Sequence, residues 1–79
     1  PQDAAYFCLM QMYIVGETSG KLYDSAVSTL ADWMDQSRSQ AERDEILVIA
    51  QHVAAGNLYK ALGNCRKLLK SDLDEAEYA

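Results

Sequence analysis

The segment from Gly16 to Lys21 has the residue types of a phosphate-binding loop, in which backbone amides and a lysine hold the phosphates. The spacing does not fit this motif. Three residues separate Gly16 from Gly20 where four are needed, and Leu22 follows the lysine where the motif has Ser or Thr. The residues before Gly16 indicate a helix rather than the strand that precedes such a loop. We therefore interpret the segment as a turn between two helices.

Metal and acid–base chemistry have few candidates in this sequence. His52 is the only histidine, and positions 48 and 56, where a second ligand on the same helix face would lie, are Val48 and Gly56. Asp32 and Asp35 share one helix face, which suits a cation or a basic partner but is more simply a solvated surface. There is no Gly-x-Ser-x-Gly elbow and no Ser-His-Asp arrangement. We expect no catalytic residues, no metal and no cofactor, and so no enzyme.

The two cysteines, Cys8 and Cys65, show neither Cys-x-x-Cys nor metal-ligand spacing. Both fall at apolar positions of predicted helices, which favours two buried free thiols in a reducing compartment. A disulfide that joins the first helix to the last is the alternative, and the sequence leaves it open.

Two helices are predicted in the first half of the chain. The first runs from Asp3, a good N-cap residue, to Val15, and Gly16 ends it. Between residues 4 and 15 only Gln11 is polar, which is typical of a helix that is covered on all sides. The second helix runs from Lys21 to Gln36. Its apolar positions recur every three or four residues and form one face: Leu22, Tyr23, Ala26, Val27, Leu30, Trp33 and Met34.

Two further helices are predicted in the second half. Ser39 and Glu42 have the spacing of a capping box, in which the serine caps the amide of Glu42 and the glutamate reaches back. The third helix ends at Gly56, and Asn57 caps the fourth. No segment alternates with the period of a strand. We expect an all-α fold, a compact bundle of about four short helices that dimerises, with residues 1–71 as one domain and residues 72–79 as an acidic tail.

Charge is sorted along the chain. The net charge is −5, with −4 in residues 1–37, +3 in residues 38–70 and −4 in residues 71–79. The basic cluster consists of Lys60, Arg66, Lys67 and Lys70, and it favours nucleic-acid binding. The overall negative charge argues against that function, and the acidic tail is placed to fold over the cluster.

The first helix gives the strongest indication of function. A chain of 79 residues barely provides enough surface to enclose an apolar helix on every side. The alternative is that the bundle encloses this helix completely. We favour an exposed apolar patch, which usually marks an interface. The residues that we expect at this interface are Tyr6, Phe7, Met10, Tyr13, Ile14 and Trp33.

These patterns predict a small acidic protein that binds another protein, as a regulator, adaptor or inhibitor of bacterial or phage type. The expected partner is a second copy, and possible charged docking faces for a second protein are formed by Asp24, Asp32 and Asp35 or by the basic cluster. The alternatives are a nucleic-acid-associated regulator and an acidic nucleic-acid mimic that inhibits a basic protein. No small-molecule substrate is expected. The longest apolar run has twelve residues, whereas a membrane span needs about 20, so we expect a cytoplasmic protein.

Overall fold

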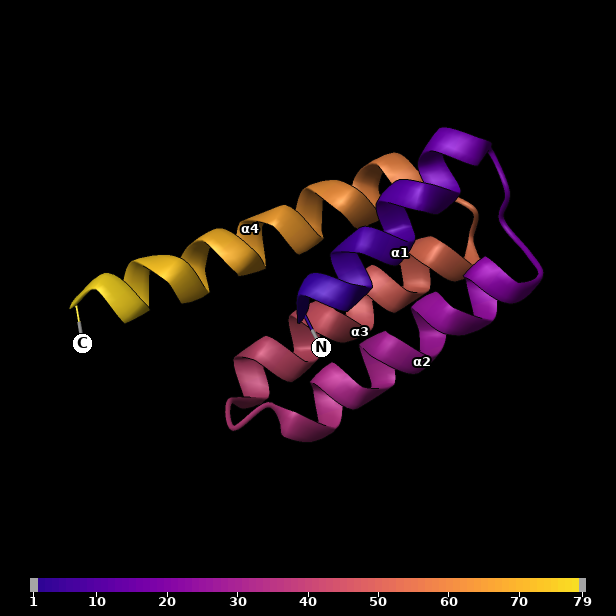
Figure 1. Ribbon diagram of the computed structural model, residues 1–79. Coiled ribbons are helices and arrows are strands. Elements are labelled where there is room, and N and C mark those ends of the chain that lie inside the picture. The colour runs from indigo at the N-terminus through magenta and orange to yellow at the C-terminus, as the bar shows by residue number, and fades with distance from the viewer. Residues whose placement is uncertain (1, 79) are drawn as a thin grey trace.

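Four helices make up the chain in the computed structural model, which describes the backbone of residues 2–78 and the side chains of residues 2–70. They are α1 (Gln2–Val15), α2 (Lys21–Gln36), α3 (Gln40–Ala54) and α4 (Leu58–Tyr78). Short turns join them, so that the chain runs up and down in successive helices (Figure 1). No strand occurs among the described residues, and the all-α prediction is confirmed.

Each helix packs against two others. α1 contacts α2 and α4, and α3 contacts the same two helices from the other side. The core lies between them, and its residues come from one face of each helix: Ala5, Leu9 and Met12 from α1, Ala26, Leu30 and Trp33 from α2, Ile46, Ile49 and Val53 from α3, and Leu58, Ala61, Leu62 and Cys65 from α4. The molecule measures 38 × 21 × 17 Å, because α4 extends past the other helices (Figure 1).

The start of α1 differs slightly from the prediction. The helix begins at Gln2, so Asp3 lies in its first turn and is not the N-cap. There its negative charge still faces the positive end of the helix dipole. The end is as predicted, because Gly16 adopts a φ of 79° and its amide donates to the carbonyl of Met12 at 2.8 Å. The bounds predicted for the second helix, Lys21 to Gln36, are confirmed.

The predicted capping box at the start of α3 is only half present. Ser39 Oγ accepts a hydrogen bond from the amide of Glu42 at 3.3 Å, as predicted. The carboxylate of Glu42 does not reach back to Ser39. It accepts a hydrogen bond from Trp33 Nε1 instead, while the amide of Ser39 donates to Ser37 Oγ.

The turn between α3 and α4 is built on Gly56. Its φ of 77° belongs to the left-handed region, which glycine enters without steric cost. The amide of Gly56 donates to the carbonyl of Val53, and the amide of Asn57 donates to the carbonyl of His52, which is the Schellman arrangement. Asn57 Oδ1 accepts from the amide of Lys60 at 3.4 Å, so Asn57 caps α4 as predicted.

The last helix is longer than expected. α4 is continuous from Leu58 to Tyr78, and the boundary that we placed after residue 71 falls inside it. A continuous helix leads away from its own earlier turns, so the expectation that the tail folds over the basic cluster is wrong. The acidic side chains of residues 72–79 lie outside the described side chains. Within the described part of the chain, no helix combines the length and the apolar character that crossing a membrane requires.

Candidate functional site

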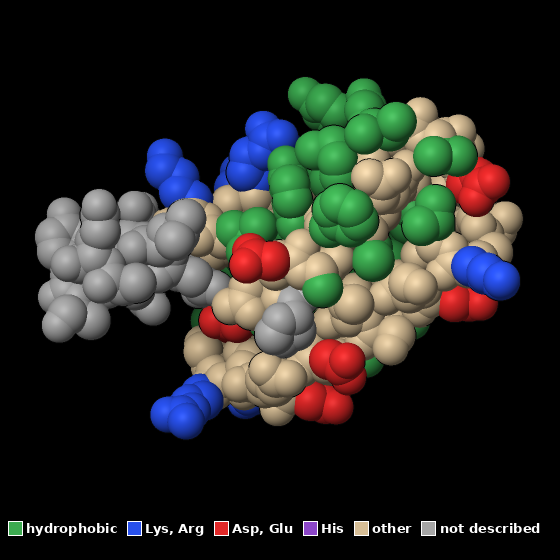
Figure 2. Space-filling model, in the orientation of Figure 1, with side chains coloured by type: hydrophobic (Ala, Val, Ile, Leu, Met, Phe, Trp, Pro, Cys, Tyr) green, Lys and Arg blue, Asp and Glu red, His purple; other side chains and the backbone are tan. Residues whose placement is uncertain are grey.

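The apolar character of α1 is divided between two faces. Ala5, Leu9 and Met12 are buried in the core. On the other side Phe7 is 63% exposed, Tyr13 51%, Ile14 69% and Val15 55%, and we call these four residues the α1 face. Figure 2 shows hydrophobic side chains gathered over α1 and the adjoining part of α4. The expected exposed apolar patch is therefore present, and the alternative that the bundle encloses this helix is wrong.

Trp33 does not belong to this surface. It is 2% exposed, lies in the core on α2, and uses its Nε1–H in the hydrogen bond to Glu42. The same three-four spacing that made Trp33 a candidate anchor places it on the buried face of its helix. Its assignment to the interface is therefore corrected.

Tyr6 and Met10 are partly buried where α1 meets α4. Arg66 of α4 donates a hydrogen bond from its guanidinium to the hydroxyl of Tyr6 at 3.1 Å. This hydrogen bond raises the pKa of Arg66 above its usual value. The contact marks the register of the two helices, because it places Tyr6 and Arg66 at the same level.

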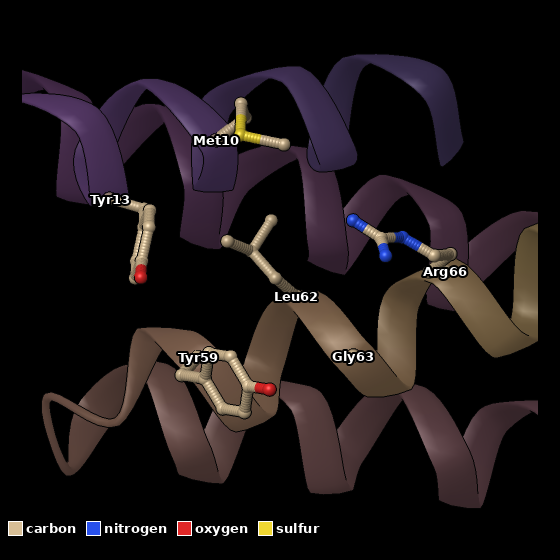
Figure 3. A pocket seen from close by; sticks show the side chains of 6 residues that line it. All are labelled: Met10, Tyr13, Tyr59, Leu62, Gly63 and Arg66. Atoms are coloured by element: carbon tan, nitrogen blue, oxygen red, sulfur yellow. The ribbon is translucent and has the colours of Figure 1, made fainter.

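A pocket of about 220 Å³ lies between α1 and α4, next to the α1 face. Its lining residues are Met10, Tyr13, Tyr59, Leu62, Gly63 and Arg66. Figure 3 shows the two tyrosines at one end, the guanidinium at the other, and Met10 and Leu62 between them. Small-molecule sites usually measure about 300–1,000 Å³. This pocket has the size for one side chain of a partner.

Gly63 is unusual because it lies in the interior of α4, where glycine is less favourable than alanine by about 1 kcal/mol. A Cβ atom built at this position meets no atom within 4 Å. The packing of the chain itself therefore does not require a glycine here. A position without a side chain at the edge of a pocket allows close approach by a molecule outside the chain.

The charged residues singled out in the sequence lie on two separate helices. Lys60, Arg66, Lys67 and Lys70 are all exposed on α4, and Figure 2 shows basic side chains beside the hydrophobic patch. Asp24, Asp32 and Asp35 are exposed on α2. The structure thus joins the basic cluster to the apolar patch, and it places the acidic residues on a different helix.

Both cysteines are free. Cys8 on α1 is half-buried, whereas Cys65 on α4 lies in the core, and burial raises the pKa of Cys65 to about 12. His52 is half-buried in the last turn of α3. Across the part of the chain that the structure describes, no three His, Cys, Asp or Glu side chains gather as metal ligands would.

Sequence reasoning missed three residues of the pocket: Tyr59, Leu62 and Gly63. Among the described side chains, Tyr59 is the most exposed of the large hydrophobic ones, at 77%. The spacing of Tyr59, Gly63 and Arg66 places them on one helix face, which is a signal that the sequence contains.

Comparison with known proteins identifies the family. A family model described as flagellar protein FlbT matches residues 1–74. In two strains of Caulobacter vibrioides, the flagellum biosynthesis repressor protein FlbT and a probable flagellum biosynthesis repressor protein FlbT are each 31% identical over 70 residues. These alignments cover 89% of this chain and 50% of each relative, so the chain spans about half the length of the curated relatives it matches. No solved structure matches significantly. The chain belongs to the FlbT family of flagellar proteins.

Proposed function

We propose that this chain is a regulator of flagellum biosynthesis that acts by binding another protein, not by catalysis. The regulatory class follows from the Caulobacter relatives, whose names describe repressors of flagellum biosynthesis. The binding mode is supported by the α1 face, which is the single observation on which this proposal depends most.

The α1 face has the composition of a protein interface. Phe7, Tyr13 and Ile14 are exposed by half or more, and Tyr59 and Met10 adjoin them at the pocket. Aromatic residues and methionine are enriched at the centres of interfaces, whereas charged residues are depleted there. α1 carries one charged side chain, Asp3, and it lies at the far end of the helix. A partner that covers this surface removes several large apolar side chains from water.

Site-specific photocrosslinking in the native host tests this proposal. A photoreactive phenylalanine analogue is placed at Phe7, and in a control chain at Gln51, which is exposed on α3. We expect covalent adducts with a protein from position 7 and none of the same adducts from position 51. Equal adducts from both positions, or no protein adduct from position 7, would overturn the proposal.

Nucleic-acid binding is the second candidate, and one specific observation favours it. The exposed ring of Tyr59 lies beside the exposed cations Lys60, Arg66 and Lys67 on α4. Single-stranded nucleic acids are bound by such combinations, because bases stack on aromatic rings while cations contact phosphates. The overall charge of −5 opposes this function.

A gel-shift assay with single-stranded RNA and DNA tests the second candidate. The expected shift weakens steeply with salt, because binding releases counterions from the phosphates. Lys67→Glu should abolish the shift, while Lys21→Glu on α2 should leave it nearly unchanged. The absence of any shift at low salt would eliminate this candidate. In the crosslinking experiment, adducts from position 7 with nucleic acid alone would favour this candidate over protein binding.

A further inference from the structure

We propose that the α1 face is the centre of a symmetric dimer, in which Tyr59 of each copy fills the pocket of the other. The inference rests on the proposed function, since it names a second copy of this chain as the protein that covers the α1 face. Its starting observations are an exposed tyrosine and a pocket of matching size that lie side by side on one molecule.

The register between α1 and α4 determines where the tyrosine and the pocket lie. The two helices run in opposite directions, and three pairs of residues lie at the same levels. Arg66 is hydrogen-bonded to Tyr6, Leu62 lies across from Met10, and Tyr59 lies across from Tyr13 (Figure 3). Tyr59 is therefore near the C-terminal end of α1, and Arg66 is near its N-terminal end.

Consider a two-fold axis that lies in the plane of contact, perpendicular to α1 and level with the midpoint between Met10 and Gln11. This axis places the exposed apolar residues of the two copies opposite one another. The α1 helices of the two copies then run antiparallel, and Phe7 of one copy faces Ile14 of the other. These are the two most exposed large hydrophobic side chains of α1, at 63% and 69%. The same operation keeps the α4 helices of both copies on one side of the α1 pair.

This axis brings Tyr59 to the pocket of the second copy. Tyr59 lies at the level of Tyr13, so it faces the level of Cys8 in the second copy. Within the second copy, the part of α4 that lies beside Cys8 is the part between Gly63 and Arg66. Gly63 has no Cβ to obstruct the ring, and the guanidinium of Arg66 is placed for a cation–π contact with it. Symmetry forms the same contact twice, as an isologous interface requires.

Three exposed aromatic side chains supply about half of the area that such a dimer buries. A standard interface buries ~800 Å² per partner, which is about 15% of the 5247 Å² of this surface. At about 200 Å² for a complete aromatic side chain, the exposed fractions of Phe7, Tyr13 and Tyr59 supply about 400 Å². Ile14, Val15 and the partly buried Met10 contribute to the remainder. The absence of charge from the middle of α1 avoids like-charge repulsion at the axis.

Light scattering during gel filtration, in reductant and over a series of concentrations, tests the dimer. We expect a concentration-dependent mass that approaches twice 8.8 kDa. Tyr59→Ala removes the inserted ring, and Gly63→Leu fills the pocket where the lone chain has open space. Each should raise the dissociation constant at least ~10-fold, as expected for a central aromatic contact. Leu47→Ala, a change of an exposed apolar residue on α3, should have no effect. Circular dichroism checks that all three variants remain helical.

Mixing the two variants provides a second test that loss of folding cannot mimic. Tyr59→Ala removes one wall of the pocket but leaves its Gly63 and Arg66 end, where the partner's ring is expected to insert, and Gly63→Leu leaves Tyr59 in place. Their heterodimer has one complete contact of the two, while each homodimer has none, so the mixture should associate more tightly than either variant alone.

A monomeric mass at all concentrations, or a mixture no tighter than its components, would overturn the dimer. The proposed function would still stand if Phe7 crosslinks to a different protein in cells. It would fall if no protein is captured from Phe7.

Discussion

Trp33 Nε1 donates a 2.9 Å hydrogen bond to Glu42 Oε1, and this bond joins the last turn of α2 to the first turn of α3. The indole ring is almost completely buried, whereas its N–H points to the edge of the bundle where the carboxylate lies. Glu42 therefore makes a contact between two helices and does not complete the capping box with Ser39. The bond therefore ties α2 to α3 across the short turn between Gln36 and Gln40.

Replacement of Glu42 should show the contribution of this bond to stability. Glu42→Ala leaves the indole N–H without its acceptor, and we expect a loss of about 1–2 kcal/mol in the free energy of unfolding. Glu42→Gln retains an acceptor oxygen and should lose less than half as much. Urea unfolding followed by the fluorescence of Trp33 measures both variants. Equal losses would show that the charge of Glu42 at the start of α3, and not the bond to Trp33, is what matters.

Two glycines should respond in opposite directions to the same substitution. Gly56→Ala forces a side chain into a backbone conformation with φ of 77°, and we expect it to destabilise the fold by about 1 kcal/mol or more. Gly63→Ala places a methyl group in open space within a helix, and we expect it to stabilise the fold by up to ~1 kcal/mol. Thermal unfolding at a concentration where the chain is monomeric compares the two. A loss of stability in Gly63→Ala would mean that α4 is not helical at this position.

Local patterns in the sequence were sufficient to predict most of the fold. The spacing of apolar residues located all four helices, and Gly16, Gly56 and Asn57 marked ends that the structure confirms. The behaviour of Glu42 could not be predicted in this way. Its partner, Trp33, lies on a different helix, and a capping box is defined by local spacing alone. The length of α4 was underestimated, because the boundary placed after residue 71 falls inside a continuing helix.

The candidate site was harder to predict, for a geometric reason. Periodicity identified α1 as apolar all round, but it could not say which side the bundle would leave open. That choice depends on which helices pack beside α1, and only α2 and α4 do. The pocket likewise depends on the antiparallel register of α1 and α4, which brings Tyr6 and Arg66 together across sixty residues of sequence.

The buried thiol of Cys65 should make stability depend on pH in the alkaline range. Burial raises its pKa to about 12, from a usual value near 9. Below pH 9 both the folded and the unfolded chain keep the proton, and the full stability is present. Between pH 9 and 12 the unfolded chain releases the proton while the folded chain retains it, so the free energy of unfolding falls as pH rises.

Comparison with Cys65→Ala isolates this effect from other groups that titrate in the same range. At about pH 10.5 the wild type should have lost ~2 kcal/mol more than the variant, relative to pH 8, because one pKa unit corresponds to about 1.4 kcal/mol. Urea unfolding in the presence of reductant at both pH values measures the difference. Parallel losses in the two proteins would show that Cys65 is accessible to solvent in the folded state.

Phe7 and Leu9 allow binding to be separated from folding, because they lie two residues apart on opposite faces of α1. Leu9→Ala creates a cavity in the core and should cost about 2–5 kcal/mol of stability. Phe7→Ser changes a side chain that is already 63% exposed and should alter stability by less than about 0.5 kcal/mol. If the α1 face is an interface, Phe7→Ser nevertheless abolishes association with the partner, while Leu9→Ala retains it at temperatures where the variant is folded. Calorimetry and light scattering on the same samples measure the two properties. A Phe7→Ser chain that unfolds as readily as Leu9→Ala would mean that Phe7 is part of the core, and it would remove the main support for the α1 face as a binding surface.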